Sequence, residues 1–446
     1  MKAKWISVLI MTLFIITILS ACTKAGEKPN ESNSENSDIT VASESEENMA
    51  NSAETEASLD GITLSFWNSY TGSDGDILRE YVNEFNAVNE YGITVNMDIM
   101  PWDTFSQKLP QTISTNTAPD VVLWGYDGLG AYVSEGAFQS LDDYWEKGNA
   151  PKDDFHANIL DLYNIDGVQY EIPFVAFGAT YYYWNKDLFS AAGLDPENPG
   201  TTWDEVIENA KKITNASENI YGMAIPTGDY QLTHAMIVGA GYGWYDEESN
   251  TSNLTRPEVI DVFTRLQNAV QADKVSPMNV TGNEFDTLFA NGRIGQYFNG
   301  PWLLNALRES GVNFGVTVLP EGPVSMGSTG FAIPSTVSEE HKLAVYKFID
   351  YMMSAEKVKE WSLKNGFPPV LISVGEDSEI LNDTALRAYT EGLSTAKAKY
   401  VGSQKVSTIS SEVVGPLCEQ IYFGNADVAE SCEKAAKKMD DILTQE

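Results

Sequence analysis

Cysteine and histidine are scarce in this chain of 446 residues, with three of each. The histidines stand singly, and there is no Cys-x-x-Cys pair and no mixed Cys/His cluster. Zinc sites need such ligands grouped at short spacing, so the sequence predicts no metal site and no cofactor. The Gly-x-Ser-x-Gly nucleophile motif and the phosphate-binding glycine loop of NTPases are also missing. We therefore predict no catalytic residue and no enzyme activity.

Basic residues are few, with 28 Lys and Arg against 64 Asp and Glu, which gives a formal net charge of −36. That charge excludes nucleic acid and anionic membrane surfaces as expected partners. The bidentate guanidinium of arginine matches phosphate geometry, so a phosphorylated ligand requires arginine in its site. Six arginines are present, mostly on expected helix faces: Arg79, Arg256, Arg265, Arg293, Arg308 and Arg387. Their placement disfavours a glycerol-phosphate-like ligand and favours a neutral one.

Long hydrophobic runs are limited to the N-terminus. Lys2 and Lys4 precede an apolar run over residues 5–19, which ends in Ser20-Ala21-Cys22. The run is shorter than the roughly twenty residues that span a bilayer. We interpret residues 1–22 as a lipoprotein signal in which Cys22 is acylated and becomes the new N-terminus. The alternative is an uncleaved anchor, and either interpretation places the protein body at the extracellular face of the cell membrane.

Residues 23–60 contain no aromatic side chain and are rich in Glu, Ser and Asn, so we expect a disordered acidic tether. The rest of the chain is too long for one core and suits two domains. Cys418 and Cys432 remain after Cys22. Outside the cell they could form a disulfide between two C-terminal helices, or they could be two buried free thiols, and the sequence leaves both open.

The first part of the folded chain has the pattern of a parallel α/β sheet. Residues 62–67 and 93–99 alternate like strands on either side of an amphipathic helix, and residues 119–123 form a buried apolar run after a second helix at 105–113. Parallel strands place ligands at their carboxyl ends. The segments 67–70 and 124–127 follow two of these strands, so they are expected to share one rim.

The second part repeats this pattern. Thr202-x-x-Glu205 predicts a capping box that begins a helix over 206–213, and a short strand is expected at 221–225. A further helix at 259–270 precedes a strand at 294–298. That strand ends in Asn299-Gly300-Pro301-Trp302, where the proline suits the first turn of a helix.

Three stretches resemble a known family. The first comprises Gly167–Pro173, with an extended turn expected at Ile172-Pro173, then Tyr181–Phe189, Gly193-Leu194 and Thr201–Glu205. The second runs from Phe285 to Trp302, and the third is Gly327–Pro334, which is similar to a glycine-rich turn of that family. Together they resemble the extracellular solute-binding proteins (family 1, sugar-binding class) of bacterial ABC importers.

The resemblance implies an α/β, two-domain, periplasmic-binding-protein-like fold of type II, maltose-binding-protein-like, with three hinge crossings. The first lobe is expected to comprise residues 61–174 and 313–366, and the second lobe residues 175–312 and 367–446. It also implies that the strand at 314–319 returns to the first sheet and that the rigid segment Asn365–Pro369 is the third crossing.

Sugar-binding sites stack apolar sugar faces on aromatic rings and bind hydroxyl groups with polar side chains. Four tryptophans lie at strand ends or in glycine-flanked loops, where either ligand contact or core packing is expected, whereas Trp184, Trp203 and Trp361 lie within regular elements and are expected in the core. Asp127 either binds sugar hydroxyls or caps a helix. The expected ligand-binding residues, some taken from the family's pocket positions, are Trp67, Asn68, Tyr70, Phe105, Trp124, Asp127, Tyr230, Gln231, Trp244, Asn299, Trp302, Gly330 and Phe367.

The resemblance implies a lipid-anchored, monomeric receptor that closes on a mono- or oligosaccharide and delivers it to the transmembrane subunits of an ABC permease. One alternative keeps the fold but binds a polyamine, a peptide, a metal chelate or a glycerol-phosphate-like solute. Another is a secreted glycan-acting enzyme with two opposed carboxylates. The order of elements, without eight βα units, argues against that enzyme.

Overall fold

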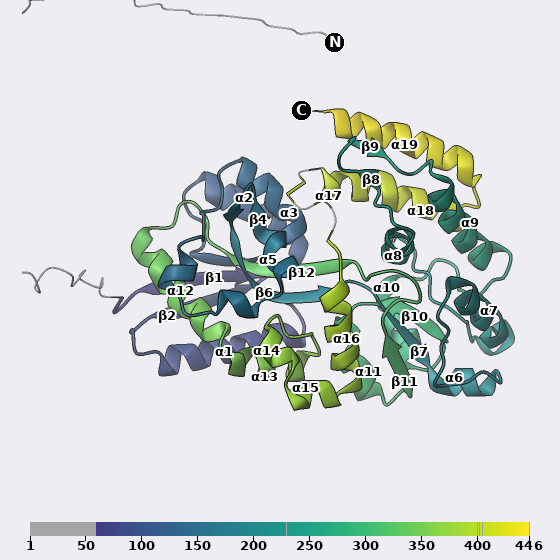
Figure 1. Ribbon diagram of the computed structural model, residues 1–446, viewed down its shortest axis with the longest axis horizontal. Coiled ribbons are helices and arrows are strands. Elements are labelled where there is room, and N and C mark those ends of the chain that lie inside the picture. The colour runs from purple at the N-terminus through teal and green to yellow at the C-terminus, as the bar shows by residue number, and fades with distance from the viewer. Residues whose placement is uncertain (1–58, 229, 399, 401, 404, 446) are drawn as a thin grey trace, which may run out of the picture. The chain divides into compact units, whose positions relative to one another are not determined.

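The computed structural model in Figure 1 describes residues 59–228, 230–398, 400, 402, 403 and 405–445. The expected lipoprotein signal with Cys22 lies outside these residues, and so does the expected tether up to residue 58. Across the described ranges, none of the helices combines the length and the apolar character that crossing a membrane requires.

The larger sheet has five strands in the order β2-β1-β3-β12-β6. They are β1 (Thr63–Asn68), β2 (Thr94–Ile99), β3 (Val121–Gly125), β6 (Glu171–Gly178) and β12 (Met326–Ala332). β1 runs parallel to β2 and to β3, and Trp67 pairs with Asp98 on one side and Val122 on the other. The expected parallel unit is confirmed, and the carboxyl ends of β1 and β3 are neighbours.

Strand β12 lies between β3 and β6 and is antiparallel to both. The turn predicted here from the sequence is therefore wrong. Glycine explains the difference, because a Cβ on Gly327 would lie 2.4 Å from the ring of Phe177 in β6. The turn expected at Ile172-Pro173 is also strand. Pro173 is tolerated because β6 is an edge strand and the register of β12 shifts opposite it, between Thr329 and Gly330.

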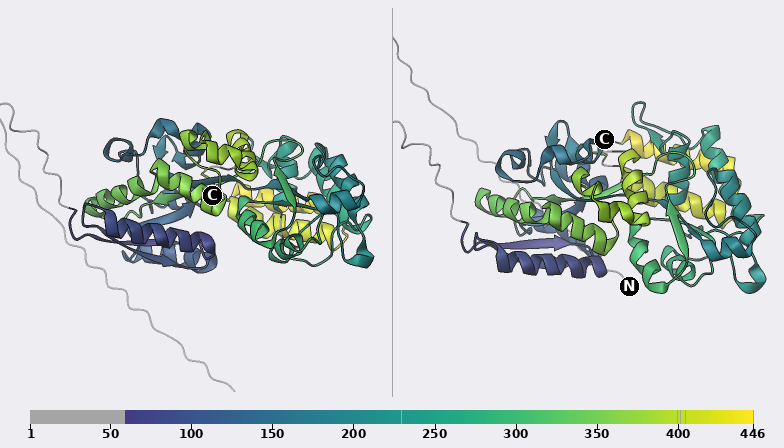
Figure 2. Two further views of the ribbon diagram at one scale, coloured as in Figure 1. Left: turned by 90° about the horizontal axis from the view of Figure 1, so that it is seen from below. Right: turned by 60° about the horizontal axis from the view of Figure 1, so that its bottom comes forward.

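Helices cover both faces of this sheet. α2 (Trp102–Ser114) and α3 (Tyr126–Ser134) lie on one side, and α1 (Ser73–Val88) and α13 (Ala355–Asn365) on the other (Figure 1). Figure 2 shows the purple α1 beside the green α12 (Glu339–Met352) and α13. Phe66 of β1 packs at 5.5 Å from Phe348 of α12. We call this sheet with these five helices the large-sheet half.

The smaller sheet has three strands in the order β10-β7-β11: β7 (Tyr181–Asn185), β10 (Gln296–Asn299) and β11 (Phe314–Thr317). β11 pairs with β7 from Phe314 opposite Asn185 to Thr317 opposite Tyr182. The expectation that this strand returns to the first sheet is therefore wrong. The strand expected at 221–225 makes a single bridge, from Tyr221 to Ile294, and otherwise runs as extended chain beside β10.

Helices surround this smaller sheet. They are α6 (Lys186–Ala191), α7 (Trp203–Ile213), α8 (Gln231–Gly239), α9 (Pro257–Gln271), α10 (Gly282–Ala290) and α11 (Leu304–Ser310). The capping box that begins α7 is confirmed: the Glu205 amide donates to the Thr202 hydroxyl at 3.2 Å, and the Thr202 amide donates to the Glu205 carboxylate at 3.3 Å. α18 (Gly415–Tyr422) and α19 (Val428–Thr444) pack on α9. We call this group the small-sheet half.

The two remaining cysteines lie on these last two helices. Cys418 of α18 and Cys432 of α19 are both buried free thiols in the structure. Burial raises the pKa of the Cys432 thiol to about 12, which keeps it protonated and unreactive at neutral pH. Of the two alternatives left by the sequence, the structure has the free thiols.

The chain passes between the two halves at places that differ from those expected. β6 stays in the large sheet to Gly178, so the first passage is at Ala179-Thr180 rather than at 174/175. The return lies between the end of β11 at Thr317 and the start of β12 at Met326, not at 312/313.

A third passage also comes later than the expected 366/367. Leu371 makes a bridge with Phe155, and the Ser373 amide donates to the Asp154 carboxylate at 2.8 Å. These contacts hold residues 371–373 against the large-sheet half. α16 (Thr384–Thr395) contacts both sheets, through β6 and β11.

Short elements complete the described chain. They are α4 (Tyr144–Lys147), α5 (Ala157–Leu160), α14 (Ile372–Gly375), α15 (Ser378–Asn382), α17 (Val406–Ile409), the hairpin strands β4 (Asn164–Ile165), β5 (Val168–Gln169), β8 (Tyr245–Asp246) and β9 (Thr251–Ser252), the 3₁₀ turns η1 (Lys152–Asp154), η2 (Asp161–Tyr163), η3 (Ala216–Glu218) and η4 (Pro301–Leu303), and the π turn η5 (Ser410–Val414).

Asp143 links α4 to α12. The pKa of its carboxyl group predicts how the free energy of unfolding depends on pH at acidic pH. Burial raises its pKa, but hydrogen bonds from Lys147, Tyr346 and Lys342 outweigh burial and lower the pKa to about 2. Because the folded pKa lies below the ordinary value of 3.8, the carboxylate stabilises the fold at neutral pH, and this contribution is lost as the pH falls from 3.8 toward 2. We expect the stability difference between the wild type and Asp143→Asn to shrink across this window in urea titrations. Parallel pH curves for the two proteins would contradict this assignment.

Candidate ligand-binding site

A cavity of about 560 Å³ lies where the two halves meet. From the large-sheet half it is lined by the ends of β3 and β6, the first residues of β12 and the start of α2. From the small-sheet half it is lined by α8 and the Trp244 loop. The lining residues are Ser69, Trp102, Gly125, Tyr126, Phe177, Ala179, Thr180, Tyr230, Gln231, His234, Trp244, Ser325, Met326, Gly327, Ser328, Thr329, Tyr400, Val406, Ser410 and Ser411.

The floor of the cavity is the small-residue start of β12. Its hydroxyl groups are held by neighbours: the Thr329 hydroxyl and the Tyr70 hydroxyl are 2.5 Å apart, and the Ser328 hydroxyl donates to the Val175 carbonyl at 2.7 Å. The Tyr126 hydroxyl donates to the Met326 carbonyl at 3.0 Å. These bonds give the floor a fixed pattern of polar atoms.

The facing wall is built on α8. Gln231 and His234 are three residues apart, so they share one face of this helix, and both line the cavity. The opposite face carries apolar residues into the core of the small-sheet half. The His234 ring stacks on Trp244 with centroids 5.0 Å apart, and Tyr230 meets Trp244 edge-on at 6.1 Å.

Tyr400 joins this wall from the C-terminal part of the chain. Its φ of 63° lies in the left-handed region, which is strained for a bulky residue. Its hydroxyl accepts the backbone N–H groups of Trp244 and Tyr245, and its ring stacks on Tyr245 at 4.4 Å. Burial raises the pKa of Tyr400, so the neutral phenol persists at physiological pH. These contacts hold the strained residue in place and fix the Trp244 loop beside the cavity.

Ser410 and Ser411 reach the cavity from the π turn η5. The turn precedes Pro416, which has no N–H to donate to the carbonyl of Glu412 four residues earlier. The π turn lies between α17 and α18. Its hydrogen bonds join residues five apart, so it does not need the bond that Pro416 cannot make. Such turns often occur at functional sites, and this one brings two adjacent serines to the cavity.

The described lining residues combine aromatic rings with neutral hydroxyl and amide groups. None of them is Asp, Glu, Lys or Arg, although the chain carries a net charge of −36. Aromatic faces can cover the C–H faces of a ligand, and the hydroxyl groups with Gln231 and His234 can exchange hydrogen bonds with it. This chemistry matches an uncharged polyhydroxylated molecule better than an anion or a cation.

Three of the expected binding residues line the cavity: Tyr230, Gln231 and Trp244. Tyr70 adjoins it through Thr329. Trp302 and Phe367 lie just outside, with their rings 5.7 Å and 5.5 Å from that of Phe177.

The remaining expected residues do not line the cavity. Trp67, Asn68, Phe105 and Trp124 are buried in the large-sheet half, and the Lys108 ammonium lies 4.0 Å from the Trp67 ring. Asn299 is buried and donates to the Asp286 carboxylate at 2.9 Å, and Gly330 pairs with Trp124 inside the sheet. The side chain of Asp127 lies outside the described part of the chain. The expected core positions of Trp184, Trp203 and Trp361 are confirmed, since all three are buried.

Several lining residues were not predicted from the sequence, notably Trp102, Phe177, Thr180, His234 and the Ser325–Thr329 stretch. Trp102 follows Pro101 at the start of a helix. A large aromatic residue at such a position could have indicated a ligand-binding residue. The small residues of β12 gave none, because their role depends on pairing with β3 and β6.

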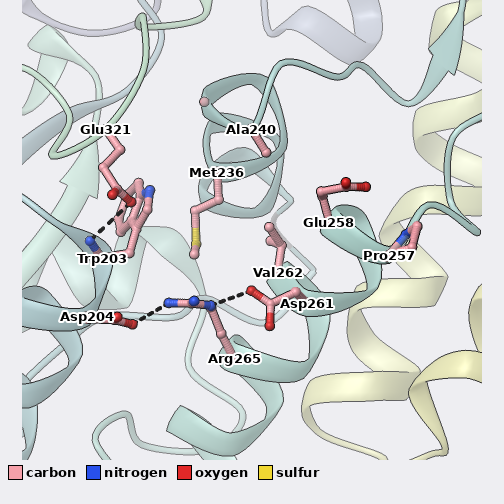
Figure 3. A pocket seen from close by; sticks show the side chains of 11 residues that line it. Trp203, Asp204, Met236, Ala240, Pro257, Glu258, Asp261, Val262, Arg265 and Glu321 are labelled. Carbon is pink, nitrogen blue, oxygen red and sulfur yellow. Dashed lines mark hydrogen bonds and ion pairs between the residues drawn. The ribbon is translucent and has the colours of Figure 1, made fainter.

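A second cavity of about 610 Å³ lies within the small-sheet half, beside α7, α8 and α9 (Figure 3). Arg265, the one basic residue among its described lining residues, already makes ion pairs with Asp204 and Asp261. Glu321 accepts the Trp203 amide at 3.4 Å. Its arginine and three of its four carboxylates, those of Asp204, Asp261 and Glu321, are engaged in these contacts, so we do not assign it the ligand.

Comparison with known proteins finds relatives that are named as binding proteins. A putative binding protein of Brucella abortus is 27% identical over 391 residues, covering 84% of this chain and 91% of the relative. The maltotriose-binding protein of Pyrococcus abyssi is 26% identical over 300 residues, covering 65% of this chain and 62% of the relative.

A solved structure shows the same fold. UgpB of Mycobacterium tuberculosis, solved in complex with glycerophosphocholine, matches with a TM-score of 0.77 at 22% identity and covers 85% of this chain and 98% of its own. The α/β fold of periplasmic binding proteins expected from the sequence is thus confirmed. The family model of the bacterial extracellular solute-binding proteins matches residues 80–388. The chain belongs to the bacterial extracellular solute-binding protein family.

Proposed function

We propose that this protein is the receptor subunit of an ABC importer and captures a neutral mono- or oligosaccharide. The observation that carries the proposal is the cavity lining, which offers aromatic rings and neutral hydroxyl groups without a described charged side chain. The maltotriose-binding relative agrees with this ligand class. The UgpB likeness points to a phosphorylated ligand instead, but the described lining lacks the arginine or lysine that a phosphate requires.

Capture proceeds by closure of two lobes that correspond to the large-sheet and small-sheet halves. Residues from both halves line the cavity, so a ligand that contacts both stabilises the closed state and shifts the population toward it. The connecting segments near residues 179–180, 318–325 and 376–383 act as the hinges. Closure needs no catalytic residue, and the protein is not an enzyme. Polyamine, peptide and metal-chelate ligands are disfavoured because the described lining has no carboxylate.

The protein acts as a monomer held at the extracellular face of the membrane by a lipid on Cys22. The acidic segment of residues 23–60 serves as its tether, and the loaded lobes dock on the permease. The charged n-region, short apolar run and Ser-Ala-Cys sequence support this anchor.

A thermal-shift screen tests the ligand class. We expect one class of neutral glycan to raise the melting temperature, because a ligand at a hundred times its Kd adds about 2.7 kcal/mol to the unfolding free energy. Phosphorylated sugars, glycerophosphodiesters, polyamines, metal chelates and short peptides form the comparison arms. A response confined to one of these arms would retain the receptor fold and discard the carbohydrate ligand. Release of sugar products in excess of the protein would overturn the receptor itself.

A further inference from the structure

Two tryptophans in the described chain are strongly exposed. The Trp102 side chain is 47% exposed and that of Trp302 is 41% exposed, whereas the other described tryptophans apart from Trp145 are buried. Tryptophan is highly buried on average, so exposed rings beside a cavity call for an explanation. Trp102 lines the cavity, and Trp302 contacts Phe177, which also lines it.

Trp102 is exposed but held in place. Its ring lies on Trp124 with centroids 5.0 Å apart and an interplanar angle of 32°, and it meets Phe105 edge-on at 5.9 Å. Trp124 packs in turn on Tyr132 at 4.8 Å, and Tyr132 stacks on Phe138 at 5.0 Å. This chain of rings supports one face of Trp102, so a ligand that stacks on it does not have to order a mobile side chain.

Trp302 is held by different means. It lies in the turn η4 directly after Pro301, and its ring meets Phe177 at an angle of 88°. The ring folds back over its own backbone, where a Cβ on Gly300 would lie 2.0 Å from it. The absence of a side chain at Gly300 is therefore required for this ring position.

The two rings rest on residues of different strands of the larger sheet. Trp102 rests on Trp124 of β3, and Trp302 contacts Phe177 of β6, while β12 lies between these two strands. Strands separated by one other strand are about 10 Å apart. Figure 1 shows α2, which begins with Trp102, in the large-sheet half, and α11, which follows Trp302, in the small-sheet half.

We infer that the ligand is an oligosaccharide long enough to reach both exposed tryptophans, with one end stacked on Trp102 and the other on Trp302. This inference rests on the proposed capture of a neutral glycan and specifies its size. Central sugar units occupy the cavity between Gln231 and the floor of β12. Trp102 then sets a preference for chain length, because only longer glycans bury its free face.

The test measures how affinity depends on glycan length. Calorimetric titrations use α-1,4-glucans, β-1,4-glucans and β-1,4-xylans, each from one to five sugar units. In the series that binds, we expect affinity to rise at least about tenfold from the shortest binding member to the longest, as stacking of one further ring implies. Trp102→Ala should remove most of this length-dependent gain, and Trp102→Phe should restore part of it.

Two further variants distinguish stacking from a structural effect. Gly300→Ala retains Trp302 but displaces its ring, so it should reduce the length-dependent gain as Trp302→Ala does. Trp145→Phe is the matched control, because this partly exposed ring packs on Tyr144 at 5.3 Å and on Phe155 at 5.8 Å, away from the cavity. Melting temperatures are recorded for every variant.

The outcomes separate the two proposals. Equal affinity for short and long glycans, unaffected by Trp102→Ala, would overturn the length inference and leave carbohydrate capture standing. No binding in any of the three series, together with a thermal shift for a phosphorylated or cationic solute, would overturn both.

Discussion

Trp244→Ala is expected to remove ligand binding and to lower the unfolding free energy by about 3 to 5 kcal/mol, the range for truncating a large buried aromatic side chain. The Trp244 side chain is buried at the back of the cavity and stacks on His234. Truncation of this side chain would leave a void beside α8. The rings of His234 and Tyr230 would each lose their contact with the Trp244 ring. Urea denaturation measures the stability, and calorimetry with the glycan found in the thermal screen measures the binding.

The matched control for this prediction is Trp244→Phe. Phenylalanine retains an aromatic face for His234 and fills much of the volume, so we expect less than half of the stability loss and measurable binding. If Trp244→Ala bound the glycan with wild-type affinity, this wall of the cavity would not contact the ligand.

Gly222→Ala is expected to destabilise the small-sheet half by about 3 kcal/mol, the upper part of the usual range for overpacking, and to weaken ligand binding. A Cβ at this position would lie 1.9 Å from the carbonyl oxygen of Ala210 in α7, which is backbone and cannot rotate away. The segment after Gly222 runs beside β10 and leads to Tyr230 and Gln231 in the cavity wall. A shift of this segment therefore moves two lining residues.

Gly282→Ala provides the comparison for this substitution. Gly282 begins α10, and a Cβ there meets nothing within 4 Å, so the change should leave stability and binding near wild type. Denaturation midpoints of the two variants test the difference directly. Equal midpoints would show that α7 can move away from Gly222 at little cost.

Local patterns in the sequence were sufficient for several elements of the fold. Alternation identified β1 and β2, a buried apolar run identified β3, and the Thr202 capping box placed the start of α7. Local sequence patterns did not predict strand pairing where the partner strand is distant in the sequence. Phe314–Thr317 has no local feature that selects β7 over the larger sheet, and the glycines of β12 resemble a turn until Phe177 packs against them.

The candidate site was harder to predict for the same reason. Position at a strand end suggested Trp67 and Trp124, but the face on which each ring lies depends on the helices that cover the sheet, and both rings are buried. Tyr230 and Gln231 were found because they match the family's pocket positions, whereas Phe105, which was taken from the same resemblance, is buried. Tyr400 was not found, since its place beside Trp244 depends on contacts more than 150 residues apart in sequence.

The measurement that tests the central claim most directly is the salt dependence of ligand affinity. Calorimetry with the glycan that binds, at about 0.02 M and about 0.5 M salt, compares conditions in which surface charges are weakly and strongly screened. A neutral sugar held by aromatic and hydroxyl groups should show the same Kd within about twofold at both concentrations. A Kd that rises steeply with salt would show that charged groups hold the ligand, and it would contradict the account of a neutral carbohydrate site.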